Sequence, residues 1–580
     1  MATVNHKKAI CAEQVTAFRG IDASSPIGDG DFAYDMKNFK ILADGSLQKR
    51  GGYRTLASLG AAVRGFGFAW DGGEEVILAA VGRSLYRIAL TGGDVRSAEV
   101  FGTDEGEVVF FEYEGEHYIL DGAEIYCYRG GVSATAACGY VPLYGKEWDA
   151  HASTNAVNEP LNLLTGRIRL DYKRGDAVSY LPVGIPIQSV DRAFRNGVEI
   201  DASGFKPSSG NQISLGGKVS LPLTIYATID PAFWHDAILR SAKETAVYDG
   251  PDSSRILFYG CDETGHLYVS RAVSEESLAA ARVGYPDATA LYVPKGNDMQ
   301  FGNRALNAVE RLGSRLFITT PDRIWLTEEL DAAFEPPMAL RLFARFPGGR
   351  VRGCVVSIRS GCPVTLSIDG VFLWEIESDP ADGFMLTRLS APIEPLLDDD
   401  YFKHARLLYR ATADELWLYR ADDPEGRVWV YGCEHKTWTS YTGMAASRMV
   451  DAGKGVGFLA GTEICLFDEE STVDECSFGP REIVGFYEGP LMEFGDAEAI
   501  KRPVRVFLEA DAGAGEIAVM LKDVRLIDEA TFRGKREGLT RYEAAVKRSR
   551  FGRLSAILRA TGKSPQRIFG YCIHAVGRKF

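Results

Sequence analysis

The stretch VILAAVGRSLYRI, residues 76–88, decides how this chain folds. An apolar run leads to Gly82, and a second apolar run that carries Tyr86 begins shortly after it. β-Branched and aromatic residues favour strands, and glycine favours the turn that joins them. The stretch therefore predicts a β-hairpin of two short strands.

The same pattern recurs along the chain. It is found again at residues 108–128, 256–269, 316–326, 364–374, 416–431 and 456–467. Corresponding large apolar residues are roughly 35–57 residues apart, with one longer gap, which is close to the period of a β-propeller blade. Seven such units suit a ring of about six or seven blades. A set of unrelated hairpins is the alternative.

The longer gap predicts an inserted domain. Residues 168–172 alternate as a half-buried strand does, and Asn196-Gly197 is a signal for a hairpin turn. After about Cys476 the rhythm changes to longer strands, which favours a further β-sandwich.

The sequence thus predicts a mainly β protein with a propeller-like centre. The expected parts are an N-terminal arm (1–60), a propeller-like domain (61–145 plus 236–475), an inserted β-sandwich (146–235) and a C-terminal β domain (476–580). The arm is glycine-rich and irregular, and we expect it to wrap its own domain or a neighbouring subunit. Helical pattern is confined to residues 275–283 and part of 236–244.

Composition restricts the function classes. The formal net charge is −14, which argues against a protein that grips nucleic acid in general. This net charge remains compatible with a protein past which DNA slides.

The ten cysteines form no CxxC pair, so we expect free thiols in a reducing compartment. No apolar run approaches the roughly 20 residues of a membrane span, and the first eight residues lack the apolar core of a signal peptide, so synthesis in a cytoplasm is expected.

Motifs of catalysis are not found in the sequence. It contains no GxSxG, Walker, GxGxxG or HExxH pattern, and none of its eight histidines has metal-ligand spacing. The run Asp398-Asp399-Asp400 has no EF-hand context and is interpreted as a solvated turn. We therefore predict no catalytic residue, metal site or cofactor, and a protein that is not an enzyme.

The end of the chain is locally basic, in contrast to the chain as a whole. This part predicts a surface that meets an acidic partner subunit or the DNA backbone, and a solvated strand face is an equally good interpretation. The candidate contact residues are Arg548, Arg550, Arg553, Arg559 and Lys563.

Two phrases carry a resemblance to a known family. The first is Asp44-Gly45-Ser46-Leu47-Gln48-Lys49-Arg50-Gly51-Gly52-Tyr53, and the second runs from Lys547 to Pro565. With the hairpins between them, they resemble the tail-nozzle or packaged-DNA stabilisation proteins of short-tailed bacteriophages. The resemblance implies a virion structural protein that forms a ring of about six copies below the portal and adaptor. Such a ring holds packaged DNA and lets it pass on ejection without sequence specificity.

The inserted domain departs from the simplest pattern of that family, so nozzle, neck and baseplate positions remain open. Two other classes also remain open. One is a receptor- or carbohydrate-binding tail protein that uses the inserted domain for recognition. The other is a propeller glycosidase, which would bring buried carboxylates together at one end of its channel.

Overall fold

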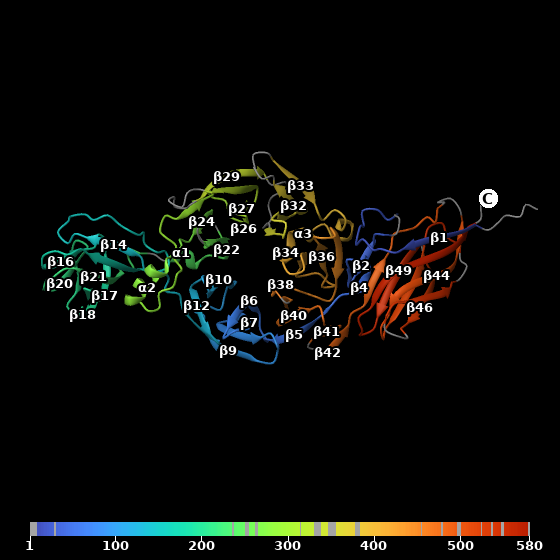
Figure 1. Cartoon of the computed structure of the whole chain (residues 1–580), viewed down its shortest axis with the longest axis horizontal. Helices are drawn as coiled ribbons and strands as arrows, with labels where there is room; N and C mark the ends of the chain where they lie inside the picture. The colour runs from blue at the N-terminus through green and yellow to red at the C-terminus, as the bar shows by residue number, and fades with distance from the viewer. Residues whose placement is uncertain are drawn as a thin grey trace, which may run out of the picture. The chain divides into compact units, whose positions relative to one another are not determined.

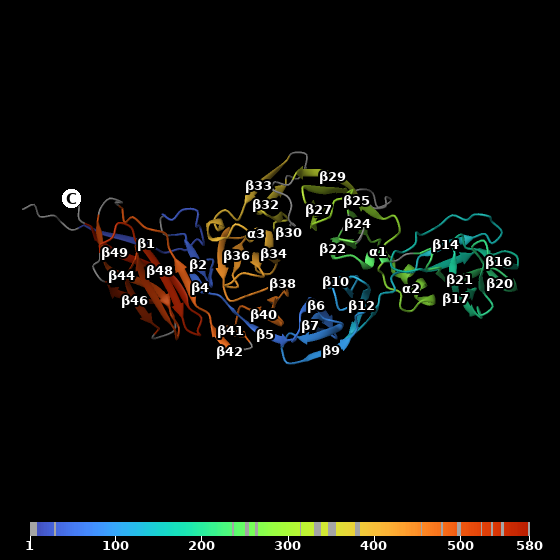
Figure 2. The same ribbon diagram turned by 180° about the vertical axis from the view of Figure 1, so that it is seen from behind.

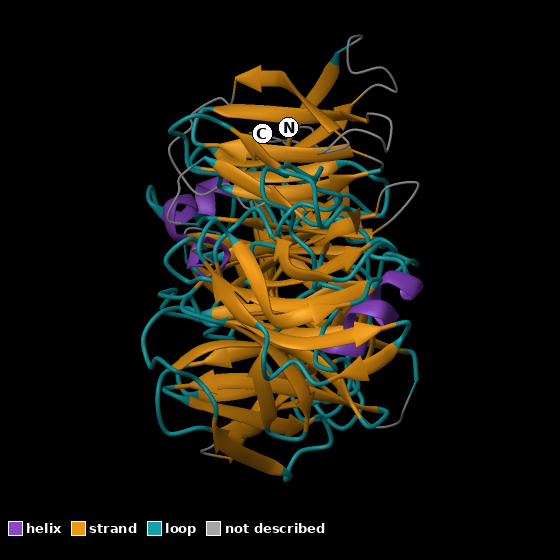
Figure 3. Cartoon of the chain, turned by 90° about the vertical axis from the view of Figure 1, so that its left-hand side faces the viewer, coloured by secondary structure: helices purple, strands orange, loops and turns teal. Residues whose placement is uncertain are grey.

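The computed structural model describes residues 9–27, 31–234, 237–249, 254–261, 265–313, 315–329, 338–345, 355–376, 383–453, 455–476, 479–495, 500–523, 525–534, 538–546 and 550–577. Strands dominate this part of the chain, and the helices are few and short (Figure 3). The helices are α1 (Ala237–Arg240), α2 (Glu275–Gly284) and α3 (Tyr401–His404), with one 3₁₀ turn at Glu394–Leu396. The prediction of a helix at 275–283 is confirmed by α2, and Ser274 caps its first turn by accepting a hydrogen bond from the Ser277 N–H.

The chain divides into two compact units. Unit 1 comprises residues 1–62, 90–93 and 348–580, and unit 2 comprises residues 63–89 and 94–347.

Unit 2 contains four sheets of one kind, each made of four consecutive antiparallel strands (Figure 1). They are β6 (Val63–Asp71), β7 (Glu74–Val81), β8 (Ser84–Ala89) and β9 (Val95–Glu99); β10 (Val109–Tyr113), β11 (Glu116–Leu120), β12 (Ile125–Gly130) and β13 (Ser133–Ala136); β22 (Glu244–Asp249), β23 (Ser254–Tyr259), β24 (His266–Val269) and β25 (Asp298–Gln300); and β26 (Ala308–Leu312), β27 (Arg315–Thr320), β28 (Arg323–Glu329) and β29 (Met338–Arg345).

Unit 1 contains three further sheets that resemble these four. Two of its sheets have the same consecutive order, and a third has six strands in the order β38-β39-β40-β5-β41-β42. Their strands are β30 (Val355–Ser357), β31 (Pro363–Ser367), β32 (Gly370–Ile376) and β33 (Phe384–Arg388); β34 (Ala405–Arg410), β35 (Glu415–Arg420), β36 (Val428–Gly432) and β37 (Thr437–Tyr441); and β38 (Arg448–Asp451), β39 (Val456–Ala460), β40 (Glu463–Asp468), β5 (Gly52–Ser58), β41 (Val473–Cys476) and β42 (Gly479–Glu482).

The seven predicted hairpins are confirmed. Each forms two adjacent antiparallel strands within one of these seven sheets, namely β7–β8, β11–β12, β23–β24, β27–β28, β31–β32, β35–β36 and β39–β40. These hairpins are buried because their apolar residues fill the layers between sheets, as with Trp417, which packs edge-on against Phe467 of β40. The fold is therefore mainly β, with a β-propeller-like part.

The gap in the repeat holds two further sheets, whose inner faces share one apolar core. Strand β15 alternates between buried and half-buried positions as predicted, and the turn at Asn196-Gly197, with positive φ at both residues, joins β17 to β18. The strands in sheet order are β14 (Leu143–Trp148), β15 (Arg167–Tyr172), β21 (Leu223–Ile229), β17 (Ile187–Arg195) and β18 (Val198–Ile200); and β16 (Val178–Pro182), β20 (Gln212–Val219) and β19 (Lys206–Ser208).

Two sheets built mostly from the last hundred residues share another core. N-terminal strands complete both of them, and Figures 1 and 2 show blue β2 and β4 beside the orange and red strands. The strands are β3 (Phe39–Ile41), β4 (Leu47–Lys49), β49 (Arg567–Gly577), β44 (Lys501–Asp511) and β47 (Thr540–Ala545), with β1 (Ala9–Val15) also on β49; and β2 (Asp35–Lys37), β43 (Gly485–Glu488), β48 (Ser555–Thr561), β45 (Glu516–Lys522) and β46 (Leu526–Arg533).

The N-terminal segment is therefore more regular than its sequence suggested. Short strands such as β2 and β4 are stabilised by partners far along the chain, which a local pattern does not reveal. Strand β5 pairs antiparallel with β40 and supplies its sheet with a fourth propeller-type strand. The last sheet of the series thus takes a strand from the segment that precedes the first.

Candidate functional site

A cavity of about 510 Å³ lies in unit 1, beside the sheet β34–β37. Five separate segments line it: Lys40–Ala43 at the end of β3, Arg410–Glu415 around the β34–β35 turn, part of β36–β37, Gly453 in the turn after β38, and Glu469 after β40. A volume of this size is within the range of pockets that hold small molecules. We call it the Arg410 cavity.

Local geometry places the charged residues of this cavity. Arg410 and Glu415 are directly opposite each other across the β34–β35 hairpin, which sets their side chains side by side. The turn between them is stabilised by Asp414, which adopts a positive φ and accepts a hydrogen bond from the Tyr409 hydroxyl at 2.7 Å.

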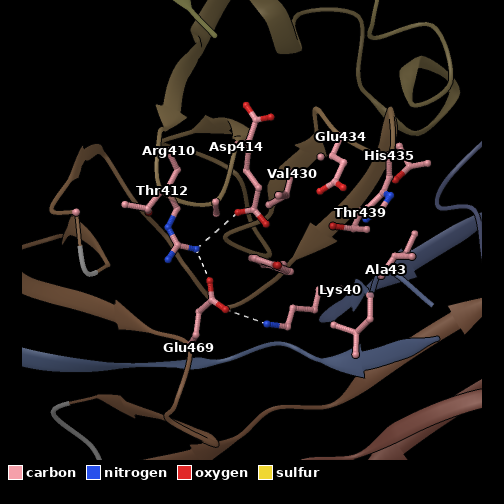
Figure 4. A pocket seen from close by; sticks show the side chains of 18 residues that line it. Lys40, Ala43, Arg410, Thr412, Asp414, Val430, Glu434, His435, Thr439 and Glu469 are labelled. Atoms are coloured by element: carbon pink, nitrogen blue, oxygen red, sulfur yellow. Dashed lines mark hydrogen bonds and ion pairs between the residues drawn. The ribbon is translucent and has the colours of Figure 1, made fainter. Parts of the chain in front are cut away.

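A chain of ion pairs crosses the cavity wall (Figure 4). The Lys40 Nζ lies 2.8 Å from Glu469 Oε2, and Glu469 Oε1 accepts a hydrogen bond from Arg410 Nη1 at 2.5 Å. The same Nη1 lies 3.7 Å from Glu415 Oε2. Glu469 therefore neutralises both cations of the cavity, and Glu415 is a more distant partner.

The two carboxyl groups have opposite pKa shifts. Burial raises the pKa of Glu415 above its ordinary value, although the indole N–H of Trp417 donates to its Oε2 at 2.9 Å. Burial also acts on Glu469, but hydrogen bonds from Lys40 and Arg410 outweigh it and lower the pKa of that group. Because Arg410 Nη1 is within reach of both carboxylates, the guanidinium group lies between them.

Tyr441 forms an aromatic part of the lining. Its side chain is buried, and its ring lies parallel to Phe467 with centroids 5.9 Å apart. Burial and the nearby Glu415 and Glu469 carboxylates hold the pKa of its hydroxyl well above the ordinary value, so the group stays protonated. Within the described part of the chain, the hydroxyl makes no hydrogen bond.

Sequence reasoning missed all of these residues. Their only local signal is an arginine and a glutamate on either side of a four-residue turn, Ala411–Asp414. Lys40 and Glu469 join them only through pairing of distant strands, which a single sequence does not disclose.

The described members of the predicted basic contact set lie elsewhere, in or next to the C-terminal strands, with Arg559 on β48. Arg553 is paired with Glu493, whose Oε1 lies 2.8 Å from its Nε and Nη2. The side chains of Arg550, Arg559 and Lys563 are exposed. Arg548 lies outside the described residues. The structure thus commits Arg553 to an internal ion pair and leaves the other three accessible to a partner.

Two of the three carboxylates in the acidic run at 398–400 form ion pairs within the chain. Asp398 accepts hydrogen bonds from Arg420 at 2.8 Å, and Asp400 pairs with Lys403. Among the residues that the structure describes, no group of three His, Cys, Asp or Glu side chains is placed to hold a metal ion.

A second polar centre lies in the phrase that carries the family resemblance. The Arg50 Nη1 and Nη2 donate to the two carboxylate oxygens of Asp474 at 2.8 and 2.7 Å, and Nε donates to Asn38 at 2.8 Å. Backbone carbonyls of Gly51 and Thr442 accept further hydrogen bonds. A Cβ at Gly52 would lie 1.9 Å from the Val473 carbonyl oxygen, so glycine is required there. The phrase is therefore a buried structural junction.

Comparisons with known proteins add little. No protein-family model matches the chain, and no curated protein matches it. Solved structures that resemble it include BBS1N in complex with ARL6DN (10% identity, 73% of this chain and 98% of that chain, TM-score 0.35) and the WD40 domain of SCAP from fission yeast (10%, 73% and 98%, 0.33). Another is apo AztD from Citrobacter koseri (13%, 75% and 95%, 0.29). At these scores the likenesses carry no functional argument.

Across the described ranges, no helix combines the length and apolar character that a membrane crossing needs.

Proposed function

We propose that this chain is a structural protein of a bacteriophage virion. In this proposal it forms a ring-shaped tail nozzle or neck conduit that retains packaged DNA and lets it pass on ejection. The protein is non-enzymatic, binds no cofactor, and works as a homo-oligomer of about six copies in contact with the portal or adaptor and other tail proteins.

The observation that carries the proposal is the buried junction around Arg50. The resemblance to the phage proteins rests on the hairpins, on the ending from Lys547 to Pro565 and on the phrase from Asp44 to Tyr53. Here Arg50 has a full set of buried partners, and Gly52 has no room for a side chain. The residues of this phrase are constrained by a buried ion pair and by the lack of space at Gly52. Such a sequence match supports a shared architecture better than a match in an exposed loop would.

The charge of the chain supports the same proposal. A net charge of −14 disfavours the salt-dependent capture of phosphate that lysine- and arginine-rich surfaces give. A conduit benefits from this property because DNA must move through it. The exposed Arg550, Arg559 and Lys563 are proposed as contacts to an acidic neighbouring subunit or to the DNA backbone.

The test is a phage in which the gene for this chain is silenced. Particles that lack the protein should package DNA and then lose it, which is measured as DNA in filled heads that becomes sensitive to nuclease. Heads that retain protected DNA without the protein would contradict the proposal.

A second candidate is a receptor- or carbohydrate-binding tail protein. Two exposed apolar side chains on the inserted segment, which lies between β13 and β22 in the sequence, favour it. Tyr180 on β16 is 52% exposed and Val198 on β18 is 68% exposed. Binding of the purified chain to immobilised host-surface glycans, lost in a Tyr180→Ala variant, would support this function.

A further inference from the structure

The Arg410 cavity has no role in the proposed conduit. Acidic side chains outnumber cationic ones in its lining. Two cations line it, Lys40 and Arg410, against the four carboxylates of Asp414, Glu415, Glu434 and Glu469. Glu469 already engages both cations. The lining therefore carries more carboxylates than cationic side chains.

Two side chains of this lining, the half-buried Glu415 and the buried Tyr441, have hydrogen-bonding capacity to spare. Both contacts of the Glu415 carboxylate use Oε2, with Trp417 and with Arg410, which leaves Oε1 for a ligand. The Tyr441 hydroxyl, on a side chain only 3% exposed, has no hydrogen-bond partner among the described residues and lines the same cavity. Both oxygens can accept a hydrogen bond, so a ligand that supplies donors fits them.

The charged side chains on the two sides of the cavity indicate which class of ligand fits it. Arg410 and Glu469 lie on one side, and Glu434 and His435 lie on the other, at an exposed rim (Figure 4). A primary ammonium offers three donors and no acceptor, and a guanidinium offers five.

We propose that the Arg410 cavity binds an organic cation, an alkylammonium or alkylguanidinium group, which donates to Glu415 Oε1 and to the Tyr441 hydroxyl and has its charge balanced by Glu415 and Glu434. The group comes from a free amine or from a lysine or arginine side chain of another copy of the chain. This binding site does not depend on the proposed conduit function.

The test is calorimetric titration of the full-length protein with cadaverine, with pentanediol as the uncharged analogue and glutarate as the anionic one. Cadaverine should bind saturably, and neither analogue should bind measurably. Glu415→Gln should weaken cadaverine binding by about tenfold or more, and Tyr441→Phe by a few fold. The Glu415→Gln side chain keeps an amide oxygen that can accept from the Trp417 indole, and thermal melting verifies that each variant is folded.

Two further variants sharpen the result. Glu434→Gln alters an exposed rim residue without risk to the core, and should weaken cadaverine binding about threefold. Glu470→Gln is the matched control, because Glu470 is exposed, adjacent to Glu469 and outside the cavity lining, and its binding constant should be unchanged.

The source of the cation is read from light scattering. If another copy supplies it, excess cadaverine or Glu415→Gln will reduce self-association; if a free amine is the ligand, self-association will stay the same. The proposal is overturned if cadaverine shows no saturable binding up to about 10 mM, if pentanediol binds as tightly, or if Glu415→Gln leaves the affinity unchanged.

Discussion

Arg50 and Asp474, 424 residues apart in the sequence, form a bidentate ion pair with N–O distances of 2.8 and 2.7 Å. The two side chains are only 1% and 3% exposed. The pair joins the N-terminal segment to β41, directly beside the place where β5 enters the last propeller-type sheet. The pair therefore anchors the start of β5 beside β41.

Breaking this pair should destabilise the protein strongly. Asp474→Asn leaves the Arg50 charge buried without a counter-ion, and we expect a loss of about 3–5 kcal/mol in the free energy of unfolding. Urea unfolding followed by tryptophan fluorescence measures it. Glu543→Gln is the control, because Glu543 pairs with Arg505 while 48% and 55% of the two side chains are exposed, and it should cost less than about 1 kcal/mol. Equal effects of the two variants would show that the buried pair has no special role.

Gly52 should not tolerate a methyl group. The Cβ of Gly52→Ala would lie 1.9 Å from the Val473 carbonyl oxygen, which forces β5 and β41 apart. We expect a loss of about 1–3 kcal/mol or more, again in urea. Gly552→Ala adds the same methyl group where no atom lies within 4 Å, and should be nearly neutral. A stable Gly52→Ala variant would mean that the two strands separate easily.

Lys49 should make stability depend on alkaline pH. Burial lowers the pKa of this lysine to about 8 from an ordinary value of 10.5. Between these values the unfolded chain binds more protons than the native one, so the contribution of Lys49 to the free energy of unfolding rises with pH. Lys49→Met should remove this rise. The check is urea unfolding of both proteins at several pH values from about 8 to 10.5, where a constant difference between them would contradict the assignment.

Glu415 should act in the opposite direction at acidic pH. Because burial raises its pKa, the native state binds more protons than the unfolded chain in the window just above the ordinary value of 4.5. Its contribution to stability is thus greatest when it is protonated and declines as the pH rises through the raised pKa. The stability of Glu415→Gln relative to the parent should increase from about pH 4 towards about pH 7, as measured by urea unfolding. A relative stability that decreases over this range would mean that the ion pair with Arg410 dominates.

The hairpins could be predicted from the sequence because each is encoded locally. Residues 76–88 contain both strands and the turn, and the same holds for residues 416–431 around the buried Trp417 and Trp429. The pairing of β5 with β40 has no local code, since nothing in Gly52–Ser58 specifies a partner some four hundred residues away.

The sites were less predictable for the same reason. The cavity draws Lys40, Arg410 and Glu469 from three segments that only the folded chain brings together. In the basic C-terminal set, the sequence indicated the charge of Arg553 but not its ion pair with Glu493, sixty residues earlier. Local charge shows that a surface can be basic, whereas the partners determine how much of that charge is available.

The oligomeric state of the purified chain tests the central claim most directly. Light scattering combined with negative-stain imaging should show a closed ring of about six copies around an open centre, because a heterologous interface with suitable rotation closes into a ring. A protein that stays monomeric at high concentration, and also in the presence of the portal or adaptor protein, would contradict the conduit.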